Sequence, residues 1–250
     1  MGVHESAIEG FGRSASAYER GRPGYPKEAV DWICERLDIT PGSTVVDLGA
    51  GTGKFARLMV AAGAGIYAVE PSAGMRDELV KAVPEAIALD ATAQAIPLPD
   101  GAVDAVTAAQ SFHWFATERV LAELHRLLRR QGGLALIWNR RDLEDPLQLA
   151  LEEIVARYRG GTPGHEDDRW MDAMRATSRF SPVGERQFDY EQSLDRSGLV
   201  DRVLSISFIA ALDRSERVAV TREVESTAGV ASEFRLPYRT EVFLFRRAEL

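Results

Sequence analysis

The chain has 250 residues, of which 45% are hydrophobic, and its formal net charge at pH 7 is −8. This length is sufficient for one sizeable core, so a single domain spanning residues 1–250 is the default expectation. The acidic balance and the lack of a long basic run argue against nucleic acid or an anionic membrane surface as the main partner.

Cysteine content and hydropathy indicate the compartment. Cys34 is the single cysteine, so an internal disulfide is excluded, and a reducing compartment fits. No stretch approaches the roughly 18 apolar residues of a membrane-spanning helix, and the first residues lack a signal peptide pattern. We therefore expect a soluble cytoplasmic protein with no membrane partner. The strong preference for arginine over lysine suggests a high-GC bacterial genome.

The first predicted elements are an N-terminal arm and a helix. Residues 1–25 are rich in glycine, serine and charge, and Pro23 and Pro26 then precede a helical pattern of apolar residues over 27–37. We expect the arm to be a separate cover, because it offers little apolar surface of its own.

Residues 44–56 join a strand pattern to a glycine turn and then to a helix. The apolar run over 44–48 predicts a parallel strand that is buried on both faces, and Asp47 is its one charged residue. Gly49, Gly51 and Gly53 follow, and glycine allows positive φ and close approach of a ligand. A ligand is therefore expected over the start of the next helix.

The remaining elements alternate in type until the middle of the chain. In order, the sequence predicts a strand over 66–70, a helix capped by Ser72, strands over 86–89 and 103–109, a helix over 117–130, a strand over 134–138, a helix over 147–158, a strand over 187–192, helices over 196–204 and 214–227, and a last strand over 238–247. This alternation predicts an α/β fold with a doubly wound, mostly parallel seven-stranded sheet and helices on both faces. Residues 139–186 interrupt it, and we expect a cap or lid inserted there after the fifth strand.

The glycine turn is compatible with several kinds of site. A phosphate-binding P-loop is excluded, because Phe55 follows Gly53-Lys54 where Ser or Thr is required. A dinucleotide fingerprint fits Gly51, Gly53 and Ala56, so an NAD-linked oxidoreductase is an alternative function. Such an enzyme would want a Tyr-x-x-x-Lys pair, which this chain lacks. A glycine-rich turn that binds no ligand is the alternative without a function.

The stretch Val46-Asp-Leu-Gly-Ala-Gly-Thr-Gly53 resembles motif I of class I S-adenosylmethionine (SAM)-dependent methyltransferases, which have a Rossmann-like fold. The resemblance implies SAM as cofactor and S-adenosylhomocysteine (SAH) as product. It places Asp47 beside the methionine end of the cofactor. The turn residues that it assigns to the cofactor are Gly49, Ala50, Gly51 and Gly53.

A second acidic residue supports a nucleoside ligand. Glu70 ends the second predicted strand before Pro71, where its two carboxylate oxygens can accept hydrogen bonds from both ribose hydroxyls of SAM or of NAD. The run over 90–104 resembles the adenine-contacting segment of the methyltransferases, which implies contacts from Ala93 and Gln94.

The resemblance extends over most of the chain, from about Tyr18 to Arg247. It is closest to small-molecule methyltransferases of bacteria, related to the trans-aconitate and ubiquinone/menaquinone types. By this resemblance Gln110 contacts the methionine part of SAM, and Tyr18 and Arg22 belong to an arm over the cofactor. A non-catalytic SAM-binding protein is a further alternative.

The carboxyl end of the fourth predicted strand carries Phe112, His113 and Trp114, at the edge where open α/β sheets bind substrates. These side chains and Arg140 are expected to bind a small-molecule acceptor, whose acceptor atom the sequence leaves open. His113 is either a general base, given its ordinary pKa of about 6.5, or a structural residue. Methyl transfer is an in-line displacement that alignment can accelerate without a base. No metal is expected, because His165 has no second histidine at ligand spacing, and the protein is expected to be a monomer or a homodimer.

Overall fold

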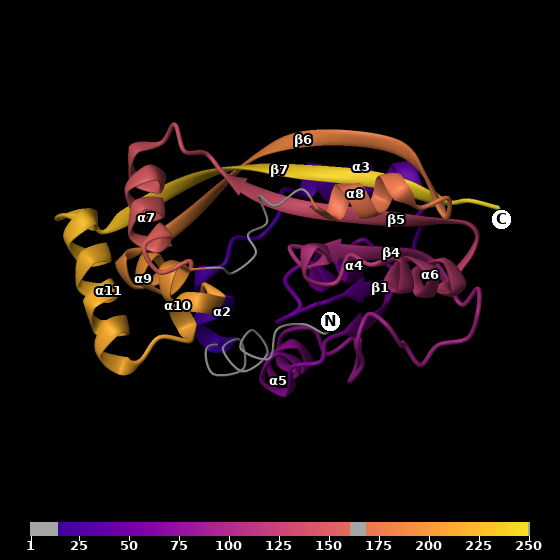
Figure 1. Ribbon diagram of the computed structural model, residues 1–250, viewed down its shortest axis with the longest axis horizontal. Coiled ribbons are helices and arrows are strands. Elements are labelled where there is room, and N and C mark those ends of the chain that lie inside the picture. Colours follow the sequence, from indigo (N-terminus) through magenta and orange to yellow (C-terminus); the bar gives the residue numbers. More distant parts are fainter. Residues whose placement is uncertain (1–14, 161–168, 250) are drawn as a thin grey trace.

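The computed structural model describes residues 15–160 and 169–249 (Figure 1). Its strands are β1 (Thr44–Leu48), β2 (Gly65–Val69), β3 (Ile87–Leu89), β4 (Val103–Ala109), β5 (Leu128–Arg141), β6 (Phe180–Asp195) and β7 (Glu233–Arg247). Its helices are α2 (Ala15–Gly21), α3 (Lys27–Leu37), α4 (Ala56–Ala61), α5 (Ala73–Ala82), the 3-10 helix η1 (Phe112–Trp114), α6 (Glu118–Leu127), α7 (Pro146–Ala156), α8 (Arg169–Ala176), α9 (Arg196–Leu204), α10 (Ser207–Ala210) and α11 (Arg214–Ala228).

The strands form one sheet in the order β3-β2-β1-β4-β5-β7-β6. The first five are parallel, whereas β7 is antiparallel to both β5 and β6. The order reverses between β1 and β4, so the loops after these two strands meet at one edge, where ligands bind in open α/β sheets. The predicted Rossmann-like, mostly parallel seven-stranded fold is confirmed.

Hydrophobic clusters cover the two faces of the sheet. One cluster joins β-strand residues to α6 and α8, with Leu121, Trp138 and Trp170 buried in it. The other joins them to α3 and α4, where Ile33 and Met59 are fully buried. Burial on both faces explains why the central strands are continuous apolar runs in the sequence.

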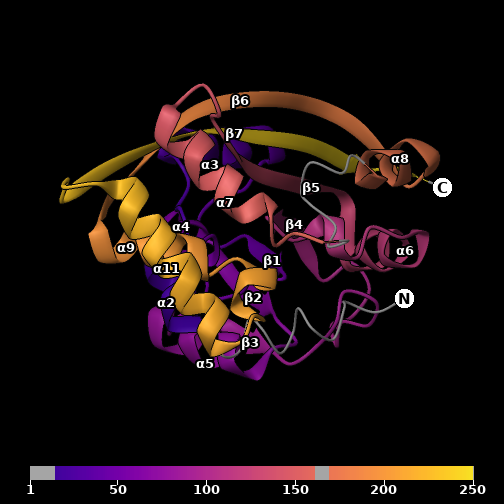
Figure 2. The same ribbon diagram turned by 60° about the vertical axis from the view of Figure 1, so that its left-hand side comes forward.

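A third hydrophobic cluster lies beyond the sheet edge, among α7, α9, α10, α11 and the ends of β6 and β7. We call these four helices the helical cap; they gather at one end of the molecule in Figures 1 and 2. The cap expected over residues 139–186 differs from this arrangement. That range is divided among the end of β5, α7, α8 and the start of β6, and most of the helical cap comes from later residues.

Some predicted boundaries were also wrong. Helix α6 ends at Leu127 and β5 begins at the next residue, because its pairing with β4 starts at Leu128. Strand β6 runs from Phe180 and not from 187, since it pairs along almost all of β7 and leaves many side chains exposed. Ser72 does precede α5, but its side chain makes no capping hydrogen bond.

Helix α2 packs closely on α9. A Cβ atom at Gly21 would lie 2.4 Å from the backbone nitrogen of Arg202, so the contact requires glycine there. Arg20 also forms a 2.7 Å ion pair with Asp201. Residues 15–21 of the predicted arm are therefore a helix held against the cap, and residues 1–14 lie outside the described part of the chain. This packing places Tyr18 and Arg22 above the sheet edge.

Candidate functional site

The loop after β1 takes the backbone form that the glycines predict. Gly49 and Gly51 have φ of 65° and 57°, in the left-handed region that favours glycine. A Cβ at Gly49 would lie 2.7 Å from Cβ of Ser111, so the loop after β4 fits closely against it. At Gly51 the one atom of the described residues within 4 Å of such a Cβ is Cε1 of Tyr18, 3.9 Å away. The backbone at Gly51 thus borders open space.

Glu70 fixes this loop from the end of β2. Its carboxylate accepts hydrogen bonds from the backbone N–H groups of Gly51 and Ser72, both at 2.9 Å. The side chain is buried, which raises the pKa of its carboxyl, while the two backbone donors lower it in part. A buried carboxylate held in this way presents its remaining lone pairs at a fixed position.

Two cavities adjoin at the carboxyl edge of the sheet. The Glu70 cavity is lined by Tyr18, Gly49, Gly51, Glu70, Pro71, Ser72, Met75, Ala109, Gln110, Ser111, Trp114 and Phe115. The arginine cavity is lined by Tyr18, Arg22, Pro23, Tyr25, Asp47, Gly49, Ala50, Thr52, Lys54, Phe55, Ala109, Gln110, His113, Trp114, Asn139, Arg141, Val155, Arg159, Arg202, Ile206, Ser207 and Phe208. They share Tyr18, Gly49, Ala109, Gln110 and Trp114, so an elongated ligand can occupy both.

Gln110 stands at the junction in a strained conformation. Its φ is 59°, which is unusual for a residue other than glycine. Its backbone N–H donates to the carbonyl of Ile137 at 2.8 Å, and its Nε2 donates to the carbonyl of Asn139 at 3.2 Å. The loop after β4 is thereby tied to β5 while the Gln110 side chain borders both cavities.

Asp47 is a buried acid in the wall of the arginine cavity, with 1% of its surface exposed. Its Oδ1 accepts a 2.8 Å hydrogen bond from the Thr107 hydroxyl, while its Oδ2 has no partner among the described residues. Burial raises the pKa of Asp47 to about 7, and the Thr107 hydroxyl opposes this. A cationic ligand group beside Oδ2 would favour the ionised form.

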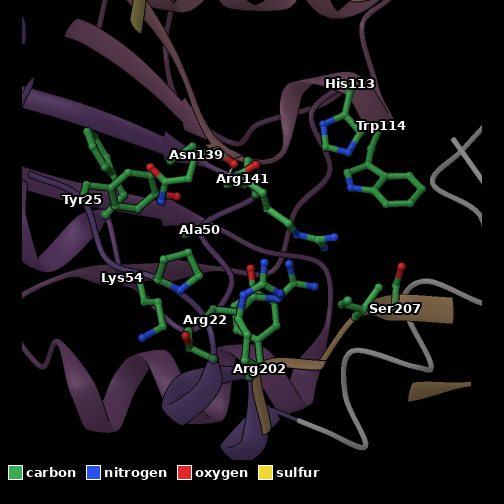
Figure 3. A pocket seen from close by; sticks show the side chains of 18 of the residues that line it. Arg22, Tyr25, Ala50, Lys54, His113, Trp114, Asn139, Arg141, Arg202 and Ser207 are labelled. Carbon is green, nitrogen blue, oxygen red and sulfur yellow. Dashed lines mark hydrogen bonds between the residues drawn. The ribbon is translucent and has the colours of Figure 1, made fainter. Parts of the chain in front are cut away.

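His113 and Trp114 lie at one side of the arginine cavity (Figure 3). Nε1–H of Trp138 lies 3.4 Å from Nδ1 of His113 and can only donate. With Nδ1 as acceptor, neutral His113 carries its proton on Nε2.

Several predicted site residues lie elsewhere. Phe112 is fully buried against Phe115 and Trp170 and lines neither cavity, so its expected role in acceptor binding is corrected to core packing. Ala93 belongs to the core, and neither it nor Gln94 lines the Glu70 cavity. A Cβ at Gly53 would meet Val83 at 2.7 Å, so this glycine serves helix packing.

Arg140 was expected at the acceptor site and lies on the opposite face of β5. Its Nε pairs with Oε2 of Glu241 at 2.5 Å, and it borders a separate groove with Trp170 and Phe243. Successive side chains of a strand point to opposite faces. Arg141, one residue later, therefore lines the arginine cavity in its place.

The sequence interpretation also missed Arg159 and Arg202. Arg202 is 5% exposed on α9, between the core residues Leu199 and Val203. An arginine on the inward face of a predicted helix was the one available signal. For Arg159, which follows α7, the sequence gives no such signal.

The methyltransferase domain family matches residues 46–136. An uncharacterized methyltransferase of Mycobacterium tuberculosis is 39% identical over 198 residues, which are 79% of this chain and 76% of that protein. An uncharacterized methyltransferase-like protein of Schizosaccharomyces pombe is 33% identical over 94% of each chain.

Solved structures share the fold. A candidate type II methyltransferase from Anaeromyxobacter dehalogenans matches with a TM-score of 0.67 and 19% identity, over 90% of this chain and 97% of that one. A geranyl diphosphate methyltransferase in complex with SAM matches with a TM-score of 0.53 and 15% identity, over 89% and 85% of the two chains.

None of the described helices is long and apolar enough to cross a membrane. Within residues 15–160 and 169–249 no cluster of His, Cys, Asp and Glu suited to a metal was found, and His165 lies outside these ranges. The identity to full-length relatives, the family match and the sheet order together show that the chain belongs to the class I SAM-dependent methyltransferases.

Proposed function

We propose that the protein binds SAM across the two adjoining cavities and transfers its methyl group to a small-molecule acceptor. The observation that carries this proposal is the Glu70 carboxylate at the end of β2, in a cavity that continues past Gly49 and Gln110 to Asp47. The residues fit such a cofactor: Gly51 leaves open space where a Cβ would project, and Asp47 has an unpartnered buried oxygen among the described residues.

The parts of SAM match different residues of the two cavities. Glu70 would accept hydrogen bonds from the ribose hydroxyls. Asp47 would face the ammonium of the methionine end, and Arg22, with Gln110, would hold its carboxylate. Tyr18, which lines both cavities, would cover the cofactor.

SAM supplies an activated methyl group: the bond from sulfur to methyl breaks with its electron pair going to sulfur, while a lone pair of the acceptor forms the new bond. The chain's residues align the acceptor and exclude water. Trp114, Tyr25 and Phe208 provide apolar walls between the sheet edge and the cap. The acidic net charge and the enclosed site support a small molecule rather than a nucleic acid or a protein.

The ionisation of Asp47 gives a pH prediction. Its pKa of about 7 in the free protein should fall when the SAM ammonium binds, because the opposite charge favours the carboxylate. SAM affinity should therefore rise as the pH increases from about 5.5 to 8 and level off above about 8. Binding near pH 6.5 should release up to one proton.

Calorimetry of SAM binding in two buffers with different ionisation enthalpies measures that proton count. Asp47→Asn should bind SAM more weakly and release no proton. Equal proton counts for the wild type and the variant would show that Asp47 does not meet the ammonium.

His113 is not expected to act as a general base, because Trp138 donates to its Nδ1 and the ring proton is then on Nε2. His113→Gln keeps a donor and should lower turnover by less than about tenfold, with SAM affinity unchanged. A general base would cost about 10²-fold or more. Steady-state rates of SAH formation from pH 6 to 8 separate the two roles. A loss of about 10²-fold or more would show that His113 is a general base.

The proposed function is tested by measuring SAH formation with separated fractions of a cell extract. The fraction of small molecules should support SAH formation, and the RNA and protein fractions should not. If only a macromolecular fraction accepts the methyl group, the acceptor class is wrong. If SAM binds and no fraction yields SAH, the protein is a non-catalytic SAM-binding protein.

A further inference from the structure

The wall of the arginine cavity carries an excess of positive charge. Four arginines line it, from the segment after α2, from β5, from α9 and from the segment after α7, whereas Asp47 is the one carboxylate among its described lining residues. Lys54 also lines it and pairs with Glu19 at 3.7 Å. In Figure 3 the guanidinium groups of Arg22, Arg141 and Arg202 point into the same space. Arg159 lines the cavity beside them.

Two of these arginines are held by neutral groups. Nη2 of Arg22 donates to the carbonyl of Ser205 at 3.0 Å, and its guanidinium lies 5.0 Å from the ring centre of Tyr18. Nε of Arg202 donates to the hydroxyl of Tyr238 at 2.8 Å. Within the described residues, neither guanidinium pairs with a carboxylate, and Nε of Arg22 is buried without a partner.

The Tyr238 hydroxyl in turn donates to Gln192, whose amide donates to the carbonyl of Gly21. This chain of hydrogen bonds fixes Arg202 with its remaining nitrogens toward the cavity.

Arg141 and Arg159 share one acid. Both contact the carboxylate of Glu152 on α7, so this carboxylate is divided between two guanidinium groups. Burial, and next the charges of Arg202 and Arg22, lower the pKa of Arg141 to about 9, and burial lowers that of Arg22 to about 10. Both side chains nevertheless stay protonated at pH 7, so the charge excess persists.

The cofactor cannot supply the missing negative charge. SAM has a sulfonium, an ammonium and one carboxylate, so it adds a net positive charge to the site. Buried cations are costly unless they are paired. Among the described residues, Arg202 has no carboxylate partner and Arg141 only shares Glu152, so an anionic second ligand of this cavity would complete their pairing.

We propose that the methyl acceptor is a small organic anion whose oxyanion group binds between Arg141 and Arg202. This inference rests on the proposed methyl transfer and specifies its substrate class. The planar forks of two guanidinium groups match the oxygens of a carboxylate or a phosphate.

The experiment separates the active small-molecule fraction on an anion-exchange resin and assays SAH formation with each part. Methyl-accepting activity should be retained on the resin and eluted by salt. Arg141→Gln should raise KM for the retained material at least tenfold, with SAH affinity unchanged. Arg141→Lys keeps the positive charge and should raise KM by a smaller factor. Arg140→Gln is the matched control, because its side chain lies in another groove, and it should leave KM unchanged.

A binding experiment tests the same site without turnover. Succinate and glycerol phosphate are titrated into the SAH complex at low ionic strength, and the one that binds identifies a carboxylate or a phosphate as the recognised group. Arg141→Gln should weaken that binding at least tenfold, with thermal unfolding confirming that the variant folds. If Arg141 binds a probe but no fraction yields SAH, the anion site stands and the proposed function fails.

Two results would overturn the anion inference while leaving methyl transfer intact. One is a methyl acceptor in the fraction that the resin does not retain. The other is an equal effect of Arg141→Gln and Arg140→Gln on KM, with neither succinate nor glycerol phosphate binding to the SAH complex.

Discussion

Replacing Glu70 by glutamine should weaken SAM and SAH by the same factor, about 30-fold to 150-fold. Both ligands carry the same ribose diol, and hydrogen bonds to a buried carboxylate contribute about 2–3 kcal/mol more than those to an amide in this setting. The amide would also lose one of the acceptors that Gly51 and Ser72 now use. Calorimetric titration of each ligand measures the change.

A matched control is available on α5. Glu78 pairs with Lys81 at 2.9 Å and lines neither cavity. Glu78→Gln should leave both dissociation constants unchanged. If Glu70→Gln behaves like Glu78→Gln, Glu70 does not hold the cofactor.

Replacing Gly51 by alanine should abolish SAM binding at concentrations at least 100-fold above the wild-type dissociation constant, while the protein still folds. Among residues 15–160 and 169–249, a Cβ at Gly51 has only Tyr18 near it, at 3.9 Å, and it would project into the space proposed for the cofactor. The backbone strain of a side chain at φ of 57° costs about 1–2 kcal/mol and is tolerable for folding.

Gly42 provides the control for a side chain at positive φ. Its φ is 92°, and a Cβ there would have nothing within 4 Å among the described residues. Gly42→Ala should therefore lose stability in chemical denaturation and keep full SAM affinity. A variant of Gly51 that folds and binds SAM like the wild type would place the cofactor elsewhere.

The sequence predicted those features of the site that depend on short-range pattern. The apolar run before Gly49, the glycine spacing and an acid at the end of the second strand all lie within 27 consecutive residues, 44–70. In a parallel sheet such segments meet at one edge whatever the details of packing. The central strands and most helices were predicted for the same reason.

The arginine cavity could not be predicted, because its members converge only through tertiary packing. Arg141 and Arg140 differ by one position on β5, and which of them faces the site depends on the phase of the strand. Arg202 reaches the cavity because α9 packs on α2 at Gly21, a contact between residues 181 positions apart. Strand β6 was underpredicted since its many exposed side chains weaken the alternating pattern.

Direct calorimetric titration of the purified protein with SAM, and in parallel with NAD, tests the central claim most directly. SAM should bind at one site with a dissociation constant in the micromolar range, which corresponds to a binding free energy on the order of −8 kcal/mol. NAD should show no comparable affinity. Tighter binding of NAD, or no binding of SAM, would contradict the assignment of the two cavities to the methyl donor.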